Sequence, residues 1–443
     1  MDSLERTEIK GVSIDSRNIR EGELFVAIKG DRFDGHDFVP DAIKKGAWGA
    51  LVERSALEKK FECLSGLKNI MPVEDTLFAL QEMSFMHRKQ FDIPVVGITG
   101  SNGKTTTKEM LAGILKRKGP VLKNEGNLNN HIGVPLTLLK INATHKTAVI
   151  EMGMSGLGEI DMLARLVSPN VAVITNIGAA HLEFLGSLEH VARAKGELLD
   201  NLRSDGTAVL NADDKYFKTL KGKFSGRVVT FGIDHTANFQ ASDIRQEKDL
   251  TDFSITADEQ RIDVRLRLVG RHNIYNALAA TAAAMTLGMS IEAVKYGLED
   301  FVPVAMRSEL RKVHGRTMFT DCYNANPGSM DAALATLVSL KARGKTVAVL
   351  GDMLELGASA AEAHRTLGAT VSRLNVDVLI TAGPLAKYIS EGAREAGMPK
   401  DRVYEAQSNS EAALLLREHS QNGDVVLIKG SRGMKMETIL EEF

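Results

Sequence analysis

One stretch of the chain combines the residue types that bind the phosphates of a nucleotide. After an apolar run at residues 93–98, the sequence continues with Gly-Ser-Asn-Gly-Lys-Thr at residues 100–105. Glycines let backbone N–H groups close around phosphate oxygens, and the start of a following helix adds the positive end of its dipole. We expect Lys104 to reach the β- and γ-phosphates and the Thr105 hydroxyl to hold Mg²⁺. The stretch therefore predicts ATP binding and phosphoryl transfer.

This loop departs by one position from the usual spacing of a phosphate-binding loop. The GxxxxGK[ST] pattern requires glycine where Ile98 stands, whereas Gly97 and Gly100 flank that position. A Gly-Lys-Thr triplet also occurs by chance, but here a strand precedes it and a helix is predicted after it at residues 106–116. The loop residues that we expect to bind nucleotide are Gly100, Ser101, Asn102, Gly103, Lys104, Thr105 and Thr106.

Three further residues could complete this chemistry. Glu151 ends an apolar strand predicted at residues 147–151, where a metal-binding acid is expected. His181 follows the next apolar strand, and ligands of open α/β sheets bind at the carboxyl ends of the strands. Lys195 lies on the helix after that. Each residue also has an ordinary interpretation, as a strand-end carboxylate facing solvent, a structural histidine and a lysine on a solvated face.

The elements that must position these residues fall into three zones that alternate strands with helices. This alternation predicts an α/β fold with parallel sheets covered by helices on both faces. The first zone, 1–92, is a small module, and the second, 93–302, is a parallel-sheet domain that contains the phosphate loop. Near the end of the second zone apolar and polar residues alternate on both sides of Asp258-Glu259-Gln260, which predicts an antiparallel hairpin at the sheet edge. Further strands are predicted at 23–28, 49–52, 170–177 and 207–210, and a further helix at 39–45.

The third zone, 303–443, predicts a second doubly wound, Rossmann-like sheet. Its strands are expected at 346–350, 376–381 and 424–429, with helices at 329–341 and 359–374. No GxGxxG follows any of these strands, so the fingerprint of a dinucleotide-binding domain is absent. We do not interpret this zone as NAD-binding.

Composition bounds the remaining possibilities. The chain has 443 residues, of which 44% are hydrophobic and 25% charged, and a formal net charge of −2. This length predicts about three domains, and the charge balance argues against a nucleic-acid or anionic membrane surface over the whole chain. Two distant cysteines, Cys63 and Cys322, make no disulfide framework, and the charged first ten residues lack the apolar run of a signal peptide. We expect a cytoplasmic monomer that binds no nucleic acid and does not insert into a membrane.

Taken together, these residues resemble the Mur ligase superfamily. The run GSNGKTTT at 100–107, Glu151, His181 and Lys195 match the pattern of its central domain, in which the displaced first glycine is normal. The segment GRHNIYNAL at 270–278 is similar to the adenine-contacting segment of these ligases. The resemblance extends over nearly the whole chain.

Five other segments are similar to one branch of the superfamily, which adds D-alanyl-D-alanine to UDP-N-acetylmuramoyl-tripeptide (UDP-MurNAc-tripeptide) in peptidoglycan synthesis. They are DSRNIREGELFVAIKGDRFDGHDF at 15–38, GNLNNHIGVPLTLL at 126–139, DCYNANPGSM at 321–330, GDMLELG at 351–357 and KGSRGMKME at 429–437. The Asp-Asn-Pro-Arg signature of the diaminopimelate-adding relative is absent. Whether the tripeptide ends in lysine or diaminopimelate stays open.

The resemblance implies that ATP phosphorylates the terminal carboxylate of the tripeptide and that the amine of D-Ala-D-Ala attacks the acyl phosphate. Two anions meet in the first step, so positive charge is required around the γ-phosphate. The implied catalytic residues are Lys104, Glu151, His181 and Lys195. Thr105 and Glu151 would bind one Mg²⁺, and His181 with a carbamylated Lys195 would bind a second. We also expect the domains to close over the substrates and expel water.

The same resemblance assigns further binding residues in all three zones. His272, Asn273 and Asn276 would contact adenine, although the segment also fits an Ala-rich packing helix. Arg307 and Asp321 would reach the ATP phosphates and ribose. The residues implied for the substrates are Asp15, Ser16, Arg17, Phe33, Asp34 and His36 for the UDP group, Asn127 and Asn130, Asn324 and Asn326 for D-Ala-D-Ala, and Lys429, Ser431 and Arg432 for a carboxylate. A turn around Asn326-Pro327 and a surface charge cluster are the ordinary interpretations of the last two groups.

Two alternatives remain at this point. A folylpolyglutamate-synthetase-like ligase shares the central pattern but typically lacks a separate UDP-binding module in front of it. A regulatory ATPase with a metabolite-sensing third domain would explain the phosphate loop but leaves the GNLNNHIG and YNANP segments without a purpose.

Overall fold

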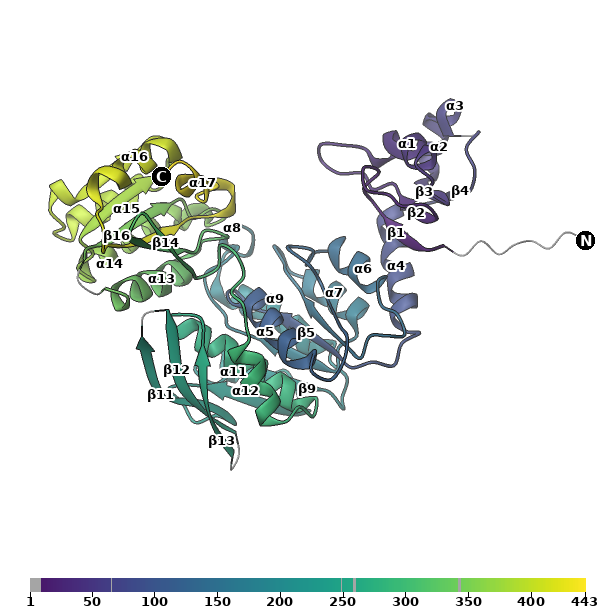
Figure 1. Cartoon of the computed structure of the whole chain (residues 1–443). Coiled ribbons are helices and arrows are strands. Elements are labelled where there is room, and N and C mark those ends of the chain that lie inside the picture. Colours follow the sequence, from purple (N-terminus) through teal and green to yellow (C-terminus); the bar gives the residue numbers. More distant parts are fainter. Residues whose placement is uncertain (1–8, 65, 248, 258–259, 342–343) are drawn as a thin grey trace, which may run out of the picture.

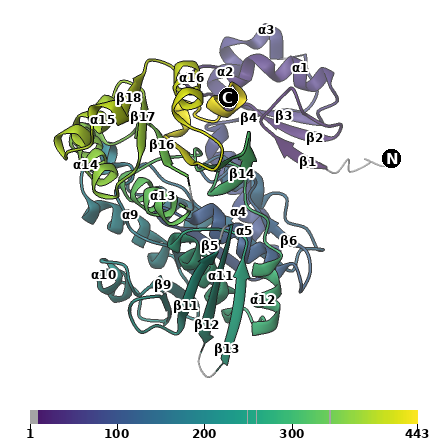
Figure 2. The same ribbon diagram turned by 60° about the vertical axis from the view of Figure 1, so that its left-hand side comes forward.

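A computed structural model describes residues 9–64, 66–247, 249–257, 260–341 and 344–443. The first eight residues and the hairpin turn at Asp258 and Glu259 lie outside the described residues. These residues form three sheets of four, nine and six strands, each predominantly parallel, which confirms the expected α/β class. Figure 1 shows the three parts, and Figure 2 shows them from a second direction.

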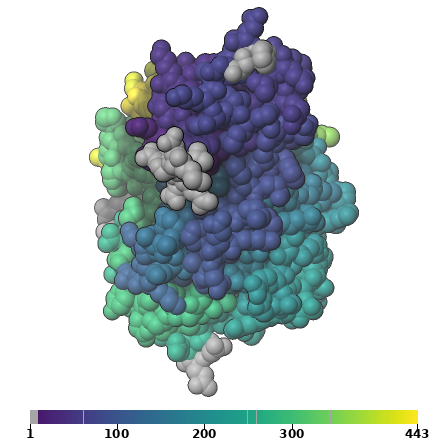
Figure 3. All heavy atoms as spheres, turned by 90° about the vertical axis from the view of Figure 1, so that its right-hand side faces the viewer, coloured from purple at the N-terminus to yellow at the C-terminus, as the bar shows by residue number. Residues whose placement is uncertain are grey.

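The N-terminal sheet is small and entirely parallel, in the order β1-β2-β3-β4. The side chains of its central strands are buried on both faces of the sheet, as is usual in parallel sheets. Short helices pack on one face, and one long helix packs on the other. That long helix, α4 (Thr76–Arg88), also packs against the next domain, and it leads from the module into it in Figure 1. Seen from the module's side in Figure 3, the module (purple) lies on the blue and teal part of the chain. The other elements are β1 (Gly11–Ser13), β2 (Glu23–Val26), η1 (Gly35–Phe38), α1 (Val39–Lys44), β3 (Gly49–Glu53), α2 (Arg54–Lys59), α3 (Phe61–Leu64) and β4 (Ile70–Val73).

The central sheet has the order β13-β12-β11-β10-β9-β8-β5-β7-β6. Strand β5 (Val95–Thr99) pairs in parallel with β7 (Thr147–Glu151) and β8 (Val171–Ile174), and all of its residues are buried. One face packs on α5 (Lys104–Leu115) and α11 (Arg271–Thr286), and the other on α7 (Glu159–Val167) and α9 (Leu188–Asp200). The carboxyl ends of β5, β7 and β8 therefore lie together at one edge, where the phosphate loop begins.

Among the remaining central elements, the antiparallel pair at the sheet edge was predicted, whereas three strands, one of them β6 at the opposite edge, were not. Strands β12 (Leu250–Ala257) and β13 (Gln260–Leu266) form the expected antiparallel pair. Strands β10 (Arg227–Gly232) and β11 (Phe239–Glu247) were not predicted. In β11 apolar and polar residues alternate weakly, and most residues after Ala241 are exposed. The others are β6 (Val121–Lys123), α6 (Gly133–Leu138), α8 (Leu182–Leu185), β9 (Thr207–Asn211), α10 (Phe217–Gly222) and α12 (Ile291–Glu299).

The third sheet has the order β14-β15-β19-β16-β17-β18, with only β14 antiparallel to its neighbour. Strands β15 (Arg316–Thr320) and β19 (Val425–Lys429) end beside the cavity described below, and α13 (Pro327–Ser339) starts there. The edge strands β14 (Glu309–Val313) and β18 (Val403–Ala406) and the inner strand β15 were not predicted, because β18 has only four residues and most positions of β14 and β15 are charged or polar. The remaining elements are β16 (Thr346–Gly351), η2 (Gly357–Ser359), α14 (Ala360–Arg373), β17 (Val378–Ala382), α15 (Lys387–Glu395), η3 (Lys400–Arg402), α16 (Asn409–His419), η4 (Arg432–Met434) and α17 (Thr438–Glu441).

Two global features of the described residues bear on function. Cys63 is exposed, Cys322 is buried, and both are free thiols. None of the helices in the described ranges is long and apolar enough to cross a membrane. The division of the chain at residues 92 and 302 stays a prediction.

Candidate active site

A cavity of about 880 Å³ is lined by residues of the central and third domains. The carboxyl ends of β7, β8 and β9 contribute from the central sheet, and those of β15 and β19 contribute from the third. The predicted site residues that line it are Ser101, Asn102, Gly103, Lys104, Thr105, Thr106, Asn127, Asn130, Glu151, His181, His272, Asn273, Asn276, Arg307, Asp321, Asn324, Asn326, Lys429 and Arg432. A second cavity of about 180 Å³ shares Lys104, His181 and Asn326 with it and adds Ser431.

Two glycines give the phosphate loop its shape. Gly100 has φ +148°, and a Cβ there would lie 1.9 Å from Thr175 Oγ1. Gly103 has φ +81°, and a Cβ there would lie 2.1 Å from Asn276 Oδ1. Because Gly103 caps α5 in the left-handed region, the helix begins at Lys104, two residues before the predicted start. Lys104 and Thr105 therefore stand in its first turn, where the backbone N–H groups are unpaired.

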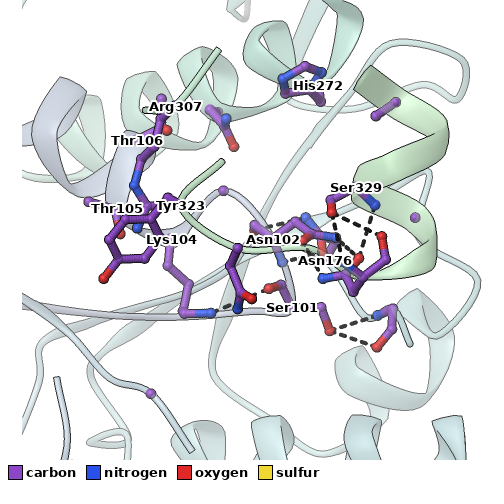
Figure 4. Close-up of a pocket in the computed structure, with 18 of the residues that line it drawn as sticks. Ser101, Asn102, Lys104, Thr105, Thr106, Asn176, His272, Arg307, Tyr323 and Ser329 are labelled. Carbon is purple, nitrogen blue, oxygen red and sulfur yellow. Dashed lines mark hydrogen bonds between the residues drawn. The ribbon is translucent and has the colours of Figure 1, made fainter. Parts of the chain in front are cut away.

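The tip of the loop is fastened to the end of β8. The Asn102 N–H donates to Asn176 Oδ1 at 3.0 Å, and the Asn102 carbonyl accepts from Thr175 Oγ1 at 2.6 Å and Asn176 Nδ2 at 3.0 Å. The Asn102 side chain also pairs with Asn326 of the third domain, whose Nδ2 donates to Asn102 Oδ1 at 2.8 Å. Figure 4 shows Asn102, Asn176 and Ser329 within one network of hydrogen bonds. Sequence analysis missed the role of Asn176, although its position directly after a strand was the available signal.

Lys104 folds back on its own loop. Its Nζ donates to the Gly100 carbonyl at 2.7 Å. Burial lowers the pKa of Lys104 below its usual range, while the Glu151 carboxylate opposes this shift and Arg307 adds to it. A phosphate group would give this ammonium an anionic partner in direct contact.

Glu151 is a buried carboxylate, 2% exposed, and each of its oxygens has a polar or charged partner. Thr105 Oγ1 donates to its Oε2 at 2.8 Å and Asn129 Nδ2 donates to its Oε1 at 2.8 Å. The fully buried Lys108 lies 3.6 Å from Oε2. Within the described residues, no group of three or more His, Cys, Asp and Glu side chains could hold a metal ion by itself. The adjacent hydroxyl and carboxylate oxygens nevertheless suit Mg²⁺, which usually completes its shell with water and substrate phosphates.

The two residues implied for a second metal differ in their surroundings. His181 lines both cavities, and its Nδ1 lies 2.6 Å from Oε2 of Glu355, a third-domain residue. This contact lowers the pKa of Glu355. Lys195 is 1% exposed and lines neither cavity. Burial lowers the pKa of Lys195 well below its usual range, and the charge of Lys104 adds to the effect.

The start of α11 forms one wall of the cavity. Asn276 Nδ2 donates to Asn273 Oδ1 at 3.1 Å, and Asn273 Nδ2 donates to the Val269 carbonyl at 2.8 Å. His272 Nε2 contacts Ser308 Oγ at 3.0 Å, and its buried Nδ1 has no partner among the described residues. Burial lowers the pKa of His272, so the ring is neutral near pH 7. An unpaired ring nitrogen of this kind suits a nitrogen heterocycle.

Sequence analysis missed Asp213 and Tyr275 beside this wall. Tyr275 Oη donates to Asp213 Oδ2 at 2.8 Å, and Asp213 also accepts from the backbone N–H groups of Ile233, Asp234 and His235. Burial raises the pKa of Asp213, but these hydrogen bonds outweigh it and hold that pKa below its usual range. The position of Asp213 shortly after β9 was the available signal.

The third domain brings a cation and an ion pair to the opposite wall. The Arg307 guanidinium lies 3.8 Å from the centre of the Tyr323 ring (Figure 4). Lys429, 1% exposed, donates to Asp321 Oδ2 at 2.5 Å, to the Asp321 carbonyl at 3.2 Å and to the Asn324 carbonyl at 3.0 Å. Burial raises the pKa of Asp321, but Lys429 outweighs it and holds that pKa below its usual range. All three Lys429 donors are thereby used. Arg432 donates to Glu437 Oε1 at 2.6 Å through Nη1 and keeps further guanidinium donors, so it is better placed than Lys429 to meet a carboxylate.

The residues predicted to hold the UDP group lie in the N-terminal module and do not line this cavity. Arg17 binds Asp15 through Nε at 2.8 Å and through Nη2 at 2.8 Å, which lowers the pKa of Asp15 to about 2. Phe33 is 71% exposed and free to stack on a ligand.

Two others of this group lie deeper in the module. His36 is 1% exposed, with Nδ1 at 2.6 Å from Asp34 Oδ1 and Nε2 accepting from the Glu53 N–H at 2.9 Å. The His36 ring therefore joins the loop at Asp34 to the end of β3. Ser16 is 8% exposed, and its carbonyl accepts from Lys45 Nζ at 2.9 Å.

Family models match in all three parts of the chain. Residues 8–88 match the model described as Mur ligase family, catalytic domain, and residues 98–284 the Mur ligase middle domain. Residues 306–432 match the model described as Mur ligase, glutamate ligase domain.

Curated relatives and solved structures agree with these matches over the whole chain. The UDP-N-acetylmuramoyl-tripeptide--D-alanyl-D-alanine ligase of Bacillus subtilis is 39% identical over 99% of this chain and 94% of its own length. The ligase of the same name from Escherichia coli is 37% identical over 98% and 93%. A crystal structure of MurF from Acinetobacter baumannii superimposes with a TM-score of 0.90 at 35% identity, covering 100% of this chain and 94% of that one. MurF ligase from Thermotoga maritima, solved in complex with ADP, gives 0.87 at 30% identity over 99% and 98%.

Proposed function

Because the chain belongs to the Mur ligase family, we propose that it is an ATP-dependent ligase that adds D-alanyl-D-alanine to UDP-MurNAc-tripeptide in peptidoglycan synthesis. The observation that carries this proposal is the shared cavity, in which a phosphate loop faces the strand ends of the third domain. The full-length similarity to ligases of this name supports the choice of substrates.

The reaction joins two groups that do not react unaided, because a carboxylate is a poor electrophile. An oxygen of the tripeptide carboxylate attacks the γ-phosphorus of ATP, and ADP leaves. The amine nitrogen of D-Ala-D-Ala then attacks the acyl carbon of this acyl phosphate, loses a proton and displaces inorganic phosphate. Both carboxylate and γ-phosphate are anions, so the protein contributes chiefly by positioning them and by supplying positive charge.

We assign the nucleotide to the central domain. Lys104, which has no anionic partner in direct contact among the described residues, turns from the Gly100 carbonyl toward the β- and γ-phosphates. The loop residues from Gly100 to Thr106 donate backbone N–H groups, Arg307 and Asp321 approach from the third domain, and His272, Asn273 and Asn276 form the adenine wall. The complex of the Thermotoga maritima enzyme with ADP supports the use of this class of nucleotide.

Bound Mg²⁺ would supply charge that offsets the repulsion between the two anions. Thr105 and Glu151 would hold one ion, and His181 would help to hold a second. A neutral Lys195 amine would add to CO₂ and release a proton, giving a carbamate anion on helix α9. The burial of Lys195 supports this step, because it keeps the amine neutral.

The UDP group is assigned to the N-terminal module, and D-Ala-D-Ala is assigned to the cavity shared by the central and third domains. Asn324 and Asn326 flank the D-Ala-D-Ala position, with Ser431 and Arg432 nearest to a carboxylate, and Asn127 and Asn130 line the central wall. Asp15, Arg17, Phe33 and Asp34 contact the UDP group, and Ser16 and His36 shape its loop. A monomeric state, a cytoplasmic location and the domain limits 1–92, 93–302 and 303–443 complete the proposal.

The assay that tests this function measures phosphate release from ATP with each substrate omitted in turn. We expect release only when Mg²⁺, UDP-MurNAc-tripeptide and D-Ala-D-Ala are all present. Running the assay with the lysine and the diaminopimelate forms of the tripeptide identifies the third residue. If phosphate release is independent of D-Ala-D-Ala, or absent with both tripeptides, the proposal is wrong.

A further inference from the structure

The contact between His181 and Glu355 joins two domains at the cavity, and neither the assignment of His181 nor the ligase reaction accounts for Glu355. His181 caps α8 in the central domain, and Glu355 lies in the loop after β16 of the third. Their side chains meet with His181 Nδ1 2.6 Å from Glu355 Oε2. In Figure 1, α8 lies against the third domain.

Both partners are held in backbone conformations that non-glycine residues seldom adopt. His181 has φ +58° and Glu355 has φ +61°. Such residues persist only where the surrounding structure enforces them, and they concentrate at functional sites. The backbone supplies a second link at the same place, because the Glu183 N–H donates to the Glu355 carbonyl at 3.1 Å.

The loop that carries Glu355 is itself rigidly supported. The Met353 N–H donates to the buried His364 Nε2 at 3.0 Å, and the Leu354 N–H donates to Ser431 Oγ at 2.9 Å. The His364 ring nitrogen Nδ1 lies 2.6 Å from the Ala360 carbonyl. The loop thus presents Glu355 to the central domain from a fixed position.

We propose that Glu355 is a positioning residue that fixes the His181 imidazole with its proton on Nδ1, so that Nε2 is available to a divalent cation at the cavity. A carboxylate that accepts from one ring nitrogen sets the tautomer and raises the basicity of the other. Because the contact crosses between domains, His181 is oriented only while the third domain lies against the central one. This inference rests on the proposed function solely for the presence of a cation beside His181.

The first test reads the tautomer directly, without metal or turnover. In protein labelled with nitrogen-15 at histidine, two-bond proton–nitrogen correlations recorded near pH 8 distinguish protonation at Nδ1 from protonation at Nε2. The signal of His181 is identified by its loss in His181→Asn. We expect protonation at Nδ1 in the unaltered chain and a change toward the Nε2 form in Glu355→Ala. Protonation at Nε2 in the unaltered chain, or an unchanged signal in Glu355→Ala, would overturn the inference.

The second test separates this role from a general effect on the fold. We expect the Mg²⁺ concentration for half-maximal turnover to rise by about 10- to 100-fold in Glu355→Ala, the range usual for carboxylates that orient metal-bound histidines, with the KM for D-Ala-D-Ala unchanged. Glu355→Gln keeps a neutral acceptor and is expected to lie between. The matched control is Glu362→Ala, which removes an exposed carboxylate from α14 of the same domain and should leave the Mg²⁺ dependence as it was.

These readouts keep two failures apart. If the unaltered chain shows no turnover that requires both substrates, the proposed function fails, whereas the tautomer is still measured. If the unaltered chain turns over normally and Glu355→Ala shows the same Mg²⁺ dependence as Glu362→Ala, the positioning role fails. Glu355→Gln preserves the size of the side chain and provides the comparison if the alanine variant is poorly folded.

Discussion

At the cavity, the Lys104 ammonium has no anionic partner in direct contact among the described residues, and the phosphates of ATP would supply one. Within the described part of the chain, the hydrogen bonds of Lys104 go to loop carbonyls, whereas Glu151 accepts from Thr105 and Asn129 and lies 3.6 Å from the Lys108 ammonium. Removing an ammonium that forms no ion pair with the described residues leaves no uncompensated charge behind. We therefore expect Lys104 to be dispensable for folding and necessary for phosphate binding.

Replacing Lys104 by alanine tests this statement. We expect kcat/KM to fall by about 100- to 1,000-fold, the usual effect of removing one charge-stabilising donor, while the free energy of unfolding in urea does not decrease. Lys116→Ala, which removes an exposed lysine just beyond the end of the same helix, is the matched control. Activity of Lys104→Ala within about fivefold of the control would mean that the phosphate loop has been misinterpreted.

The two cysteines should differ sharply in reactivity. Burial raises the pKa of Cys322 to about 12, whereas Cys63 is exposed. A thiol reagent at pH 8 should therefore modify one cysteine per native chain and the second only after unfolding. Since the raised pKa favours the protonated thiol of the folded state, its contribution to stability is present below about pH 9 and declines as the pH rises toward 12. Rapid modification of both thiols in the native chain would contradict this view of the third-domain core.

At the scale of elements, the central-sheet strands that carry the phosphate loop, Glu151 and His181 were the easiest to predict from sequence, whereas β15, which precedes Asp321, was not predicted. β5, β7 and β8 are short apolar runs buried on both faces, and the polar residues that follow them meet at one sheet edge. The inner strand β11 and the edge strand β14 were missed because their exposed positions carry charged residues and they lack an apolar alternation.

The part of the site that sequence analysis missed has a different physical cause. Glu355 acquires its partner only through the packing of two domains, and Asn102 meets Asn326 across 224 positions of the sequence. No local pattern encodes such contacts. Asn176 and Asp213, in contrast, lie two residues beyond the ends of β8 and β9, so the strand-end rule that found Glu151 and His181 would also have found them once these ends were placed.

Asn326 shows how one residue serves an element and the cavity together. Its side chain accepts from the Ser329 N–H at 2.9 Å as the N-cap of α13 and also pairs with Asn102. We expect Asn326→Ala to lower the free energy of unfolding by about 1 kcal/mol and to reduce turnover. Asn326→Asp keeps the cap but loses the donor to Asn102, so stability should remain while kcat/KM falls by about fivefold.

Ser408→Ala provides the control for this pair of variants. Ser408 is the N-cap of α16 in the same domain and accepts from the Glu411 N–H at 3.2 Å. Its loss should cost stability of similar size and leave turnover unchanged. Equal turnover in Asn326→Asp and Ser408→Ala would show that Asn326 matters only as a helix cap.

At the scale of the whole molecule, the central and third domains already meet at the cavity, while the residues assigned to UDP lie outside it in the N-terminal module. A reactive acyl phosphate requires a site closed to water. We expect the radius of gyration from small-angle scattering to fall when a non-hydrolysable ATP analogue and UDP-MurNAc-tripeptide are added together. Identical scattering profiles with and without both ligands would contradict closure of the domains.

The central claim is that this cavity activates the tripeptide carboxylate by phosphoryl transfer before D-Ala-D-Ala attacks. The most direct measurement uses UDP-MurNAc-tripeptide labelled with oxygen-18 in its terminal carboxylate and mass spectrometry of both products. The account predicts one labelled oxygen in the released phosphate and one in the new amide carbonyl for each D-Ala-D-Ala joined. Amide product accompanied by unlabelled phosphate, or no amide product at all, would contradict it.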